Sequence, residues 1–513
     1  MTFLEERDFS DVPTIPEYYK GKTIFITGGS GFMGKILIEK LLYSCPELDR
    51  IYLLLRNKRG MRPEDRLADI YKSPCFERLR KERPDAFMSK VFFIAGEVNE
   101  LDLGMSDEDW SLIANRTHII FHVAASVRFD DHLTKATNLN VRGTRELVRL
   151  AGDASRLECF VHVSTSYANT DRNPVEEVMY PAHADWRDTL HMCETMPPDD
   201  VQVVTHKYLG EMPNTYVFTK QLAEHVVYEQ KGKLPIIIIR PSIVVSSLKE
   251  PIPGWIENFN GPAGIIVASG KGLIRAIYSD PKITNDYIPV DVITRGIVAS
   301  AWCRGTKKFS PTDDIPIYNM CSGGYNCVSS LDLVKMGESL TQECPLDSAL
   351  WARCSTVTDS KLLYNFKALF FQLIPSMLID TLLWLLGKKP LLVKIQRKIY
   401  TANYIALAYY STQEWTFKID NFLKLRSVLK EEDKEDFFYE LENIDIYNYF
   451  KVCVYGGRKY LMKEKDEDLP AAKVHDTRIR LIAKITNHVF YGLVFVWMCN
   501  KICQCLSPYY ISF

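Results

Sequence analysis

Residues 23–34 read TIFITGGSGFMG, a short apolar run followed by glycines at positions 28, 31 and 34. The run from Thr23 to Ile26 is typical of a buried parallel strand, and the apolar residues after the motif recur at helical spacing. A glycine motif between a strand and a helix is typical of a dinucleotide-binding unit. Gly28 permits a tight turn, Gly31 lets a pyrophosphate approach the backbone, and Gly34 lets the helix pack against the strand. The amides and the dipole of that helix would then hold the phosphates.

The next strand indicates which dinucleotide binds. Residues 51–55 (IYLLL) form it, and it ends at Arg56, where an enzyme that uses NAD usually has an acidic residue for the ribose 2′-hydroxyl. Here Arg56 is followed by Asn57, Lys58 and Arg59. A cationic cluster suits a 2′-phosphate, so the sequence predicts NADPH as the cofactor. The alternative is a solvated basic loop.

Further strands alternate with helices along the first half of the chain. Strands are expected at residues 91–95, 118–123 and 159–163, with helices at about 63–83 and 138–151. This alternation predicts an α/β fold, a Rossmann-type doubly wound parallel sheet. The third strand runs into Glu97, which should lie near the adenine, and the fourth runs into Ala124, whose small side chain leaves room for a ribose.

Composition limits the class of protein. A chain of 513 residues is long enough for two domains, and a net charge of −1 argues against a nucleic-acid partner. The 13 cysteines show no paired metal spacing, so we expect no metal site. The polar N-terminus lacks the apolar core of a signal peptide, which favours a reducing, cytosolic environment for the folded part.

Candidate catalytic residues follow the fifth strand. That strand runs into Ser164, Thr165 and Ser166, and about fifty residues later Tyr216 and Lys220 occur four apart on one face of a predicted helix. A neighbouring ammonium is expected to lower the pKa of the phenol, which could give a proton to an oxygen that gains charge as hydride arrives. A strand-end hydroxyl would hold that same oxygen. The alternative is a pair of residues on a helix surface.

These residues resemble the extended short-chain dehydrogenase/reductase superfamily. Further segments resemble one family within it, the alcohol-forming fatty acyl-CoA reductases of animals, and the resemblance runs from about residue 20 to residue 460. The matching segments are LLRNKRG (54–60), HVAASVRFD (122–130), NLNVRGT (138–144), VHVSTSYAN (161–169), RPSI (240–243), EPIPGWIENFNG (250–261) and YIPVDV (287–292).

The resemblance implies roles for individual residues. Thr165, Tyr216 and Lys220 match the catalytic positions, although Ser164 or Ser166 could supply the hydroxyl instead. Two positions depart from the family pattern: Glu97 stands where Asp is usual, and Thr294 stands where Asn is expected. Cofactor contacts are implied for Thr27, Gly28, Ser30, Gly31, Phe32, Gly34, Arg56, Glu97, Ala124, Asn140, Tyr216 and Lys220.

The activity implied is reduction of a long-chain fatty acyl-CoA to a fatty alcohol, in the supply of precursors for lipids, waxes or ether lipids. Coenzyme A would leave, and a bound aldehyde would lie between two hydride transfers from NADPH. Three alternatives stay open: an extended short-chain dehydrogenase acting on a sterol or another carbonyl, an aldehyde-forming acyl-CoA reductase, and a non-catalytic NADP-binding scaffold. A homodimer also stays open.

Four regions are expected along the chain. They are an N-terminal arm (1–21), an NADPH-binding catalytic domain (22–330), a mainly helical C-terminal reductase domain (361–460) and a basic, hydrophobic tail (473–513). Residues 310–330 are rich in turn formers and should connect two domains. The apolar residues 366–386 are interrupted by Lys367, Gln372 and Asp380, so they are not expected to span a membrane. They could form a buried core helix pair, or part of a domain that closes over an acyl chain.

The tail predicts a membrane anchor. Lys473, Arg478, Arg480 and Lys484 precede an unbroken apolar run from Val489 to Cys499, which is shorter than the roughly twenty residues that span a bilayer. Basic residues beside it favour an anionic cytosolic leaflet, and Cys499, Cys503 and Cys505 are candidate acylation sites. The protein is therefore expected on the endoplasmic reticulum or peroxisome membrane, facing the cytosol, with the tail spanning or lying on the bilayer. The alternative is a hydrophobic helix docked on the protein's own core.

Overall fold

The computed structural model describes residues 9, 11–56, 61–325 and 327–506. At its centre is a parallel sheet of seven strands in the order β10-β6-β5-β4-β1-β2-β3. Strands β2 and β3 follow β1 toward one edge of the sheet, and β4, β5, β6 and β10 follow toward the other. Such a switch point, here between β1 and β4, opens a nucleotide crevice at the carboxyl ends of the strands. The predicted Rossmann-type sheet is thus confirmed. Its strands are β1 (Thr23–Thr27), β2 (Arg50–Leu55), β3 (Val91–Ala95), β4 (Ile119–His122), β5 (Cys159–Val163), β6 (Ile236–Pro241) and β10 (Ile317–Met320).

The last of these strands corrects one expectation. Residues 310–330 do not form only a connection between domains, because Ile317–Met320 pair with Ile238–Pro241 as the edge strand of the sheet. All four residues of this strand are buried. The many turn formers around so short a strand hid its signal.

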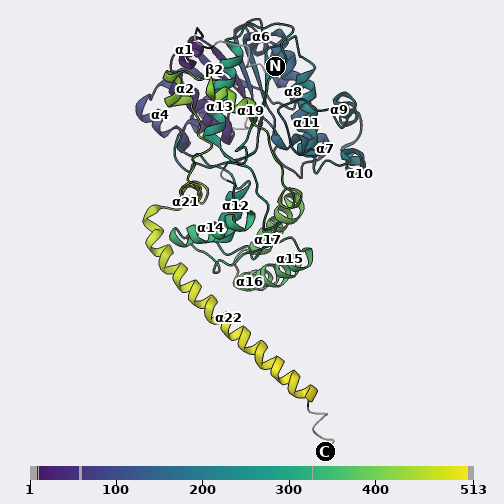
Figure 1. Ribbon diagram of the computed structural model, residues 1–513, viewed down its shortest axis with the longest axis vertical. Helices are drawn as coiled ribbons and strands as arrows, with labels where there is room; N and C mark the ends of the chain where they lie inside the picture. The colour runs from purple at the N-terminus through teal and green to yellow at the C-terminus, as the bar shows by residue number, and fades with distance from the viewer. Residues whose placement is uncertain (1–8, 10, 57–60, 326, 507–513) are drawn as a thin grey trace, which may run out of the picture.

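Helices cover both faces of the sheet (Figure 1). On one face α13 (Val290–Gly305) packs against α2 (Phe32–Ser44), β5 and β6, and α19 (Asp420–Ser427) packs on α13. On the other face α11 (Thr215–Tyr228) packs against α8 (Gly143–Asp153) and the π-helical turn Asn138–Arg142. Strands β1, β4, β5 and β6 are buried along their whole length, as expected for parallel strands covered on both faces.

A smaller layer extends from the carboxyl edge of the sheet. Two short parallel pairs, β7 (Ile243–Val245) with β9 (Tyr287–Pro289) and β8 (Ala276–Tyr278) with β11 (Thr356–Thr358), lie there. The helices α12 (Pro262–Gly270), α14 (Ser330–Glu343) and α21 (Ile446–Gly456) pack on one another and share an apolar cluster with Val245. C-terminal residues thereby become part of the layer beside the carboxyl edge of the sheet.

The apolar residues near 366–386 form α15 (Lys361–Ala368), a π-helical turn (Leu369–Leu373) and α16 (Ile374–Leu385), which packs against α17 (Leu392–Tyr400). The alternative of a buried core helix pair is wrong, since most of their large apolar side chains are exposed.

The tail forms one long helix, α22 (Leu469–Leu506), which projects from the body beside α21 (Figure 1). It is exposed over its apolar part, so the alternative of a helix docked on the protein's own core is also wrong. Two stretches, Lys361–Leu385 and Asp466–Cys503, are long and apolar enough to cross a membrane by length and composition.

The remaining helical elements connect these parts. They are α1 (Ile15–Tyr19), α3 (Pro63–Tyr71), α4 (Glu77–Glu82), α5 (Ala86–Lys90), α6 (Asp107–Arg116), α7 (Leu133–Thr137), α9 (Trp186–Thr195), α10 (Pro198–Leu209), α18 (Ala408–Ser411) and α20 (Glu431–Phe437), with 3-10 turns at 74–76, 101–104, 166–169 and 466–468 and π-helical turns at 401–406 and 457–461.

Candidate active site

The glycine turn joins β1 to α2 at the switch point of the sheet. Gly28 has φ +77°, and a Cβ there would lie 2.6 Å from the backbone nitrogen of Ala124. A Cβ on Gly34 would lie 2.2 Å from the carbonyl oxygen of Gly28. Side chains are therefore excluded at both positions, which supports the turn and packing roles predicted for these glycines.

The start of α2 suits a bound phosphate. Gly31 is its N-cap and supplies no side-chain cap. A Cβ on Gly31 would meet only the Gly28 carbonyl, at 3.2 Å, so the space beside this backbone is open. Uncapped helix amides attract anions. The exposed Ser30 and the half-buried Phe32 flank the turn.

The floor of the turn is fixed by hydrogen bonds. Thr27 Oγ1 lies 2.9 Å from Nδ1 of His122 and 3.4 Å from the Ala124 amide that donates to it. Burial lowers the pKa of His122 well below its usual value, so this ring is neutral. The buried Asn140 accepts from the amide of Ser126 at 2.9 Å and donates to Thr219 at 2.9 Å. Its side chain therefore ties the strand-end loop to α11.

Two guanidinium groups lie at the end of β2. The side chain of Arg56 is 71% exposed, and its Nη1 is 3.4 Å from Oε1 of Glu97. Arg66, on α3, has a lowered pKa because it is partly buried and because Arg56 is close enough to repel its charge. Within the described ranges Arg66 forms no ion pair. The other predicted members of this cluster, Asn57, Lys58 and Arg59, lie outside the described residues.

Thr165, Tyr216 and Lys220 come together at the carboxyl end of β5. Lys220 is buried, and its Nζ donates to the carbonyl oxygen of Val163 at 2.6 Å. Burial lowers the pKa of Lys220 to about 8. Burial raises the pKa of Tyr216 to about 12, and a hydrogen bond with Thr165 opposes that shift.

The expected lowering of the Tyr216 pKa by a neighbouring ammonium is therefore wrong for this structure. The loss of hydration outweighs the other influences on the phenol, and Lys220 is held by a strand carbonyl. The phenol is thus a neutral donor across the physiological range.

The neighbouring hydroxyls differ from Thr165. Ser164 is buried and its hydroxyl has no hydrogen-bond partner in the described part of the chain. Ser166 is fully buried beside Cys321. Of the three hydroxyls, that of Thr165 is the one hydrogen-bonded with Tyr216, and it also lies 3.4 Å from the Pro241 carbonyl oxygen.

The C-terminal region contributes residues that the sequence motifs did not identify. Tyr410, on α18, packs on Phe129 with ring centroids 5.3 Å apart, and Phe129 lies 5.7 Å from the ring of Tyr216. The Tyr410 hydroxyl accepts from Nδ2 of Asn214, the N-cap of α11, at 2.8 Å. These aromatic residues wall the site beside the phenol. Arg66 was missed as well, because it belongs to a helix that looks like ordinary charged surface.

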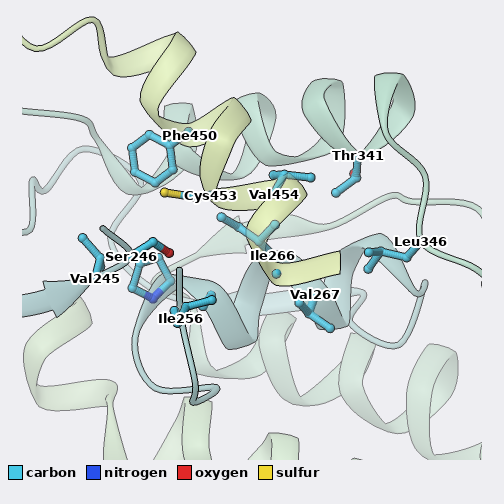
Figure 2. A pocket seen from close by; sticks show the side chains of 13 residues that line it. Val245, Ser246, Ile256, Ile266, Val267, Thr341, Leu346, Phe450, Cys453 and Val454 are labelled. Carbon is cyan, nitrogen blue, oxygen red and sulfur yellow. The ribbon is translucent and has the colours of Figure 1, made fainter. Parts of the chain in front are cut away.

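An apolar cavity lies among β7, α12, α14 and α21 (Figure 2). Phe450, Cys453 and Val454 of α21 face Ile266 of α12 across it, and Val245 lies at its strand end. It is lined by Val245, Ser246, Ile256, Pro262, Ala263, Ile266, Val267, Thr341, Leu346, Phe450, Cys453, Val454 and Gly457. A lining of this kind suits a hydrocarbon chain.

Comparison with known proteins bears on the family and the fold. Residues 26–297 and residues 371–464 each match a family model described as male sterility protein. The chain is 37% identical over 484 residues to fatty acyl-CoA reductase 1 of Homo sapiens, covering 94% of this chain and 93% of that protein. It is 33% identical over 486 residues to fatty acyl-CoA reductase wat of Drosophila melanogaster, covering 95% and 93%.

Solved structures share the fold. The reductase domain of a nonribosomal peptide synthetase from Mycobacterium tuberculosis has a TM-score of 0.58 at 17% identity, over 89% of this chain and 95% of that one. The terminal R domain of the myxalamid biosynthetic pathway has a TM-score of 0.55 at 17% identity, over 85% and 90%.

Proposed function

The chain belongs to the fatty acyl-CoA reductase family and is a reductase that uses a nicotinamide cofactor, and we propose that NADPH is this cofactor and that both hydride transfers occur at the Thr165–Tyr216–Lys220 site. The substrate class is fatty acyl-CoA and the product is the fatty alcohol. The observation that carries the assignment is the convergence of the strand-end hydroxyl, the buried lysine and the tyrosine at the carboxyl edge of the sheet, close to the glycine turn.

The preference for NADPH is supported by Arg56 and Arg66. A 2′-phosphate carries between one and two negative charges at neutral pH. Its binding would offset the repulsion between the adjacent guanidinium groups of Arg56 and Arg66. Glu97 already neutralises part of the charge of Arg56. Arg66, without an ion pair within the described ranges, is therefore the guanidinium with more charge left for the phosphate.

The glycine turn and the strand ends around it contain the residues that would hold the cofactor. The turn at Gly28, Ser30 and Gly31 and the uncapped start of α2 at Phe32 would bind the pyrophosphate. Thr27, Ala124 and Asn140 would shape the pocket on the strand side, with Glu97 toward the adenine. When bound, NADPH supplies the hydride for each reduction.

The first reduction acts on the thioester. Thr165 holds the carbonyl oxygen, and Tyr216 gives it a proton as the carbon gains a hydride. When the tetrahedral species collapses, that proton returns to Tyr216, the C–S bond breaks, and coenzyme A leaves as a thiolate that takes a proton from solvent. The aldehyde remains.

The second reduction uses the same groups. Tyr216 again gives its proton to the oxygen as the aldehyde carbon gains a hydride, and the alcohol forms. Lys220 would hold the nicotinamide ribose once NADPH is bound, and its positive charge, on the same helix as Tyr216, would favour the transient phenolate. Each acyl-CoA therefore consumes two hydrides and two protons.

We propose that the acyl chain enters along the apolar lining between α12 and α21, which would widen to receive it, because the cavity of about 20 Å³ has room for only one small group. Burial there would retain the aldehyde, because each methylene contributes about 0.8 kcal/mol when it leaves water. The tail is proposed to anchor the enzyme to the endoplasmic reticulum or peroxisome membrane with the catalytic body in the cytosol. As a helix of 38 residues, α22 is roughly 57 Å long and exceeds the bilayer core.

The test is Tyr216→Phe in the purified full chain, with alcohol and aldehyde formation from palmitoyl-CoA measured by mass spectrometry. The loss of one positioned acid should lower turnover by roughly 10²- to 10⁴-fold. NADPH binding should persist, because the glycine turn is unchanged.

The matched control is Tyr208→Phe on α10, which removes only the hydroxyl that lies 2.9 Å from that of Thr189 on α9 and keeps the ring that packs on Phe218 of α11. It should keep the wild-type rate. If Tyr216→Phe kept the wild-type turnover, Tyr216 would not be the group that donates the proton.

A further inference from the structure

The helical stretch from Lys361 to Leu385 is amphipathic in the opposite sense to a helix on a water-soluble protein. Its buried residues recur every fourth position, and the three at its centre and end are polar. Its outward side carries large apolar side chains. The buried positions are Tyr364, Ala368, Gln372, Ser376 and Asp380.

The buried polar side chains fasten this stretch to the body. Gln372 Oε1 accepts from the backbone amides of Arg275 and Ala276 at 2.7 and 3.1 Å. Its amide nitrogen donates to Gln396, 3.3 Å away on α17. These bonds lie in the middle of the stretch and satisfy the amides that precede and begin β8.

The end of α16 is fastened in a similar way. The carboxylate of Asp380 accepts from the amides of Leu391, Leu392 and Val393 at 3.0, 3.0 and 2.8 Å, where α17 begins. At the other end, the ring of Tyr364 stacks on that of Tyr404, with centroids 5.0 Å apart. The stretch is thus held to protein along its length.

The opposite side is exposed and apolar. Leu378, Leu382 and Trp384 are 64%, 59% and 67% exposed. The exposed set comprises Leu362, Leu363, Phe366, Leu369, Phe370, Phe371, Ile374, Met377, Leu378, Ile379, Leu382, Trp384, Leu385 and Leu386, and we call it the apolar face. So many large apolar side chains exposed on one helical stretch are unfavourable in water and indicate a contact with an apolar partner.

Basic residues border the apolar face. Lys388 and Lys389 follow α16, and Lys394, Arg397 and Lys398 lie on α17; all five are exposed. In the part of the chain that the structure describes, none of them forms an ion pair. Asp380 is the single acidic residue between positions 361 and 411. This basic rim suits an anionic surface.

We propose that the apolar face lies in the cytosolic leaflet of the membrane, parallel to its plane, with the basic rim at the lipid headgroups. An apolar helix face beside lysine and arginine is the pattern of an interfacial membrane helix. The stretch does not cross the bilayer, because doing so would break the bonds of Gln372 and Asp380 and bury them in hydrocarbon. This contact is separate from the tail and independent of the proposed chemistry, and only the choice of the cytosolic leaflet rests on the proposed location of the catalytic body.

The arrangement in space agrees. Helices α15, α16 and α17 lie together at the end of the body remote from the sheet, and α22 projects beyond that same end (Figure 1). A bilayer that receives the tail therefore lies on the side of the body where α15, α16 and α17 are. A symmetric contact with a second copy would instead bring two basic rims together, and like charges repel.

The test uses the full chain in vesicles of phosphatidylcholine and phosphatidylserine. An environment-sensitive fluorescent amino acid replaces Leu378, and in a matched control it replaces Val203, which is 83% exposed on α10. We expect brominated acyl chains to quench the probe at 378 and not that at 203, and aqueous iodide to quench the probe at 378 several-fold less.

Equal iodide quenching at both positions would overturn the proposal. Protection from iodide without quenching by brominated lipid would also overturn it, because protein would then cover the face. A second measurement needs no substitution: a lipid-soluble photoreactive label should modify residues 369–385 as well as α22 in the wild-type chain. Labelling confined to α22 would contradict the inference.

Discussion

Alkaline pH should inactivate this reductase through Lys220. Burial lowers the pKa of this lysine to about 8, whereas the pKa of Tyr216 is raised to about 12. The lysine is therefore the member of the pair that titrates first as the pH rises. Below pH 8 it is an ammonium that can stabilise the phenolate and bind the ribose, and above pH 8 it loses that charge.

The size of the effect follows from the titration. One pH unit above the pKa, about a tenth of the enzyme retains the ammonium, so kcat/KM should fall roughly tenfold per unit above pH 8. The phenol stays protonated over this range and adds no second limb. The assay is NADPH consumption and alcohol formation from palmitoyl-CoA across pH 6.5 to 10, with folding checked by circular dichroism.

The variant Lys220→Arg provides the comparison, because a guanidinium keeps its charge throughout this range. Any activity that it retains should lose the alkaline limb. If the wild-type profile stayed level to pH 10 while the protein remained folded, Lys220 would not be the group on which catalysis depends.

Three further perturbations test other parts of the account. Arg56→Glu should weaken NADPH binding by roughly tenfold and NADH binding much less, because it places an anion beside the 2′-phosphate. Arg66→Ala should act in the same direction, whereas Lys207→Glu on α10 should leave the affinity for both cofactors unchanged. If both arginine variants kept the wild-type cofactor preference, Arg56 and Arg66 would be ordinary surface residues. Thr165→Val should lower turnover by roughly 10²- to 10³-fold with little effect on NADPH affinity, whereas Ser164→Ala should lower turnover only slightly. A larger loss of turnover in Ser164→Ala than in Thr165→Val would assign the hydroxyl role to Ser164. Ending the chain after Lys484 should shift most of the protein to the soluble fraction, with residual membrane binding through the apolar face. This truncation keeps the ion pair between Arg353 and Asp476 at 2.6 Å. If the truncated protein stayed fully membrane-bound, the tail would not be the main anchor.

Much of the catalytic half could be predicted because its chemistry is local in sequence. The strand-turn-helix at Gly28–Gly34 depends on near neighbours, and the spacing of Tyr216 and Lys220 is fixed by one helix. The edge strand Ile317–Met320 was missed, since four buried residues among turn formers leave almost no periodic signal.

Properties that depend on distant contacts were not predictable. Tyr410 reaches the site from α18 only because the C-terminal region folds back over the sheet, and the high pKa of Tyr216 comes from burial that no motif encodes. The alternative of a buried helix pair around Gln372 and Asp380 was wrong for a similar reason. Its polar residues looked like interruptions of an apolar helix, whereas they form the side that binds the body.

The most direct test of the central claim is the stoichiometry of the purified full chain with palmitoyl-CoA. If one site performs both reductions, two NADPH should be oxidised and one thiol released for each alcohol formed, with little free aldehyde at any time. One NADPH per thiol, with aldehyde as the final product, would contradict the account and identify an aldehyde-forming reductase.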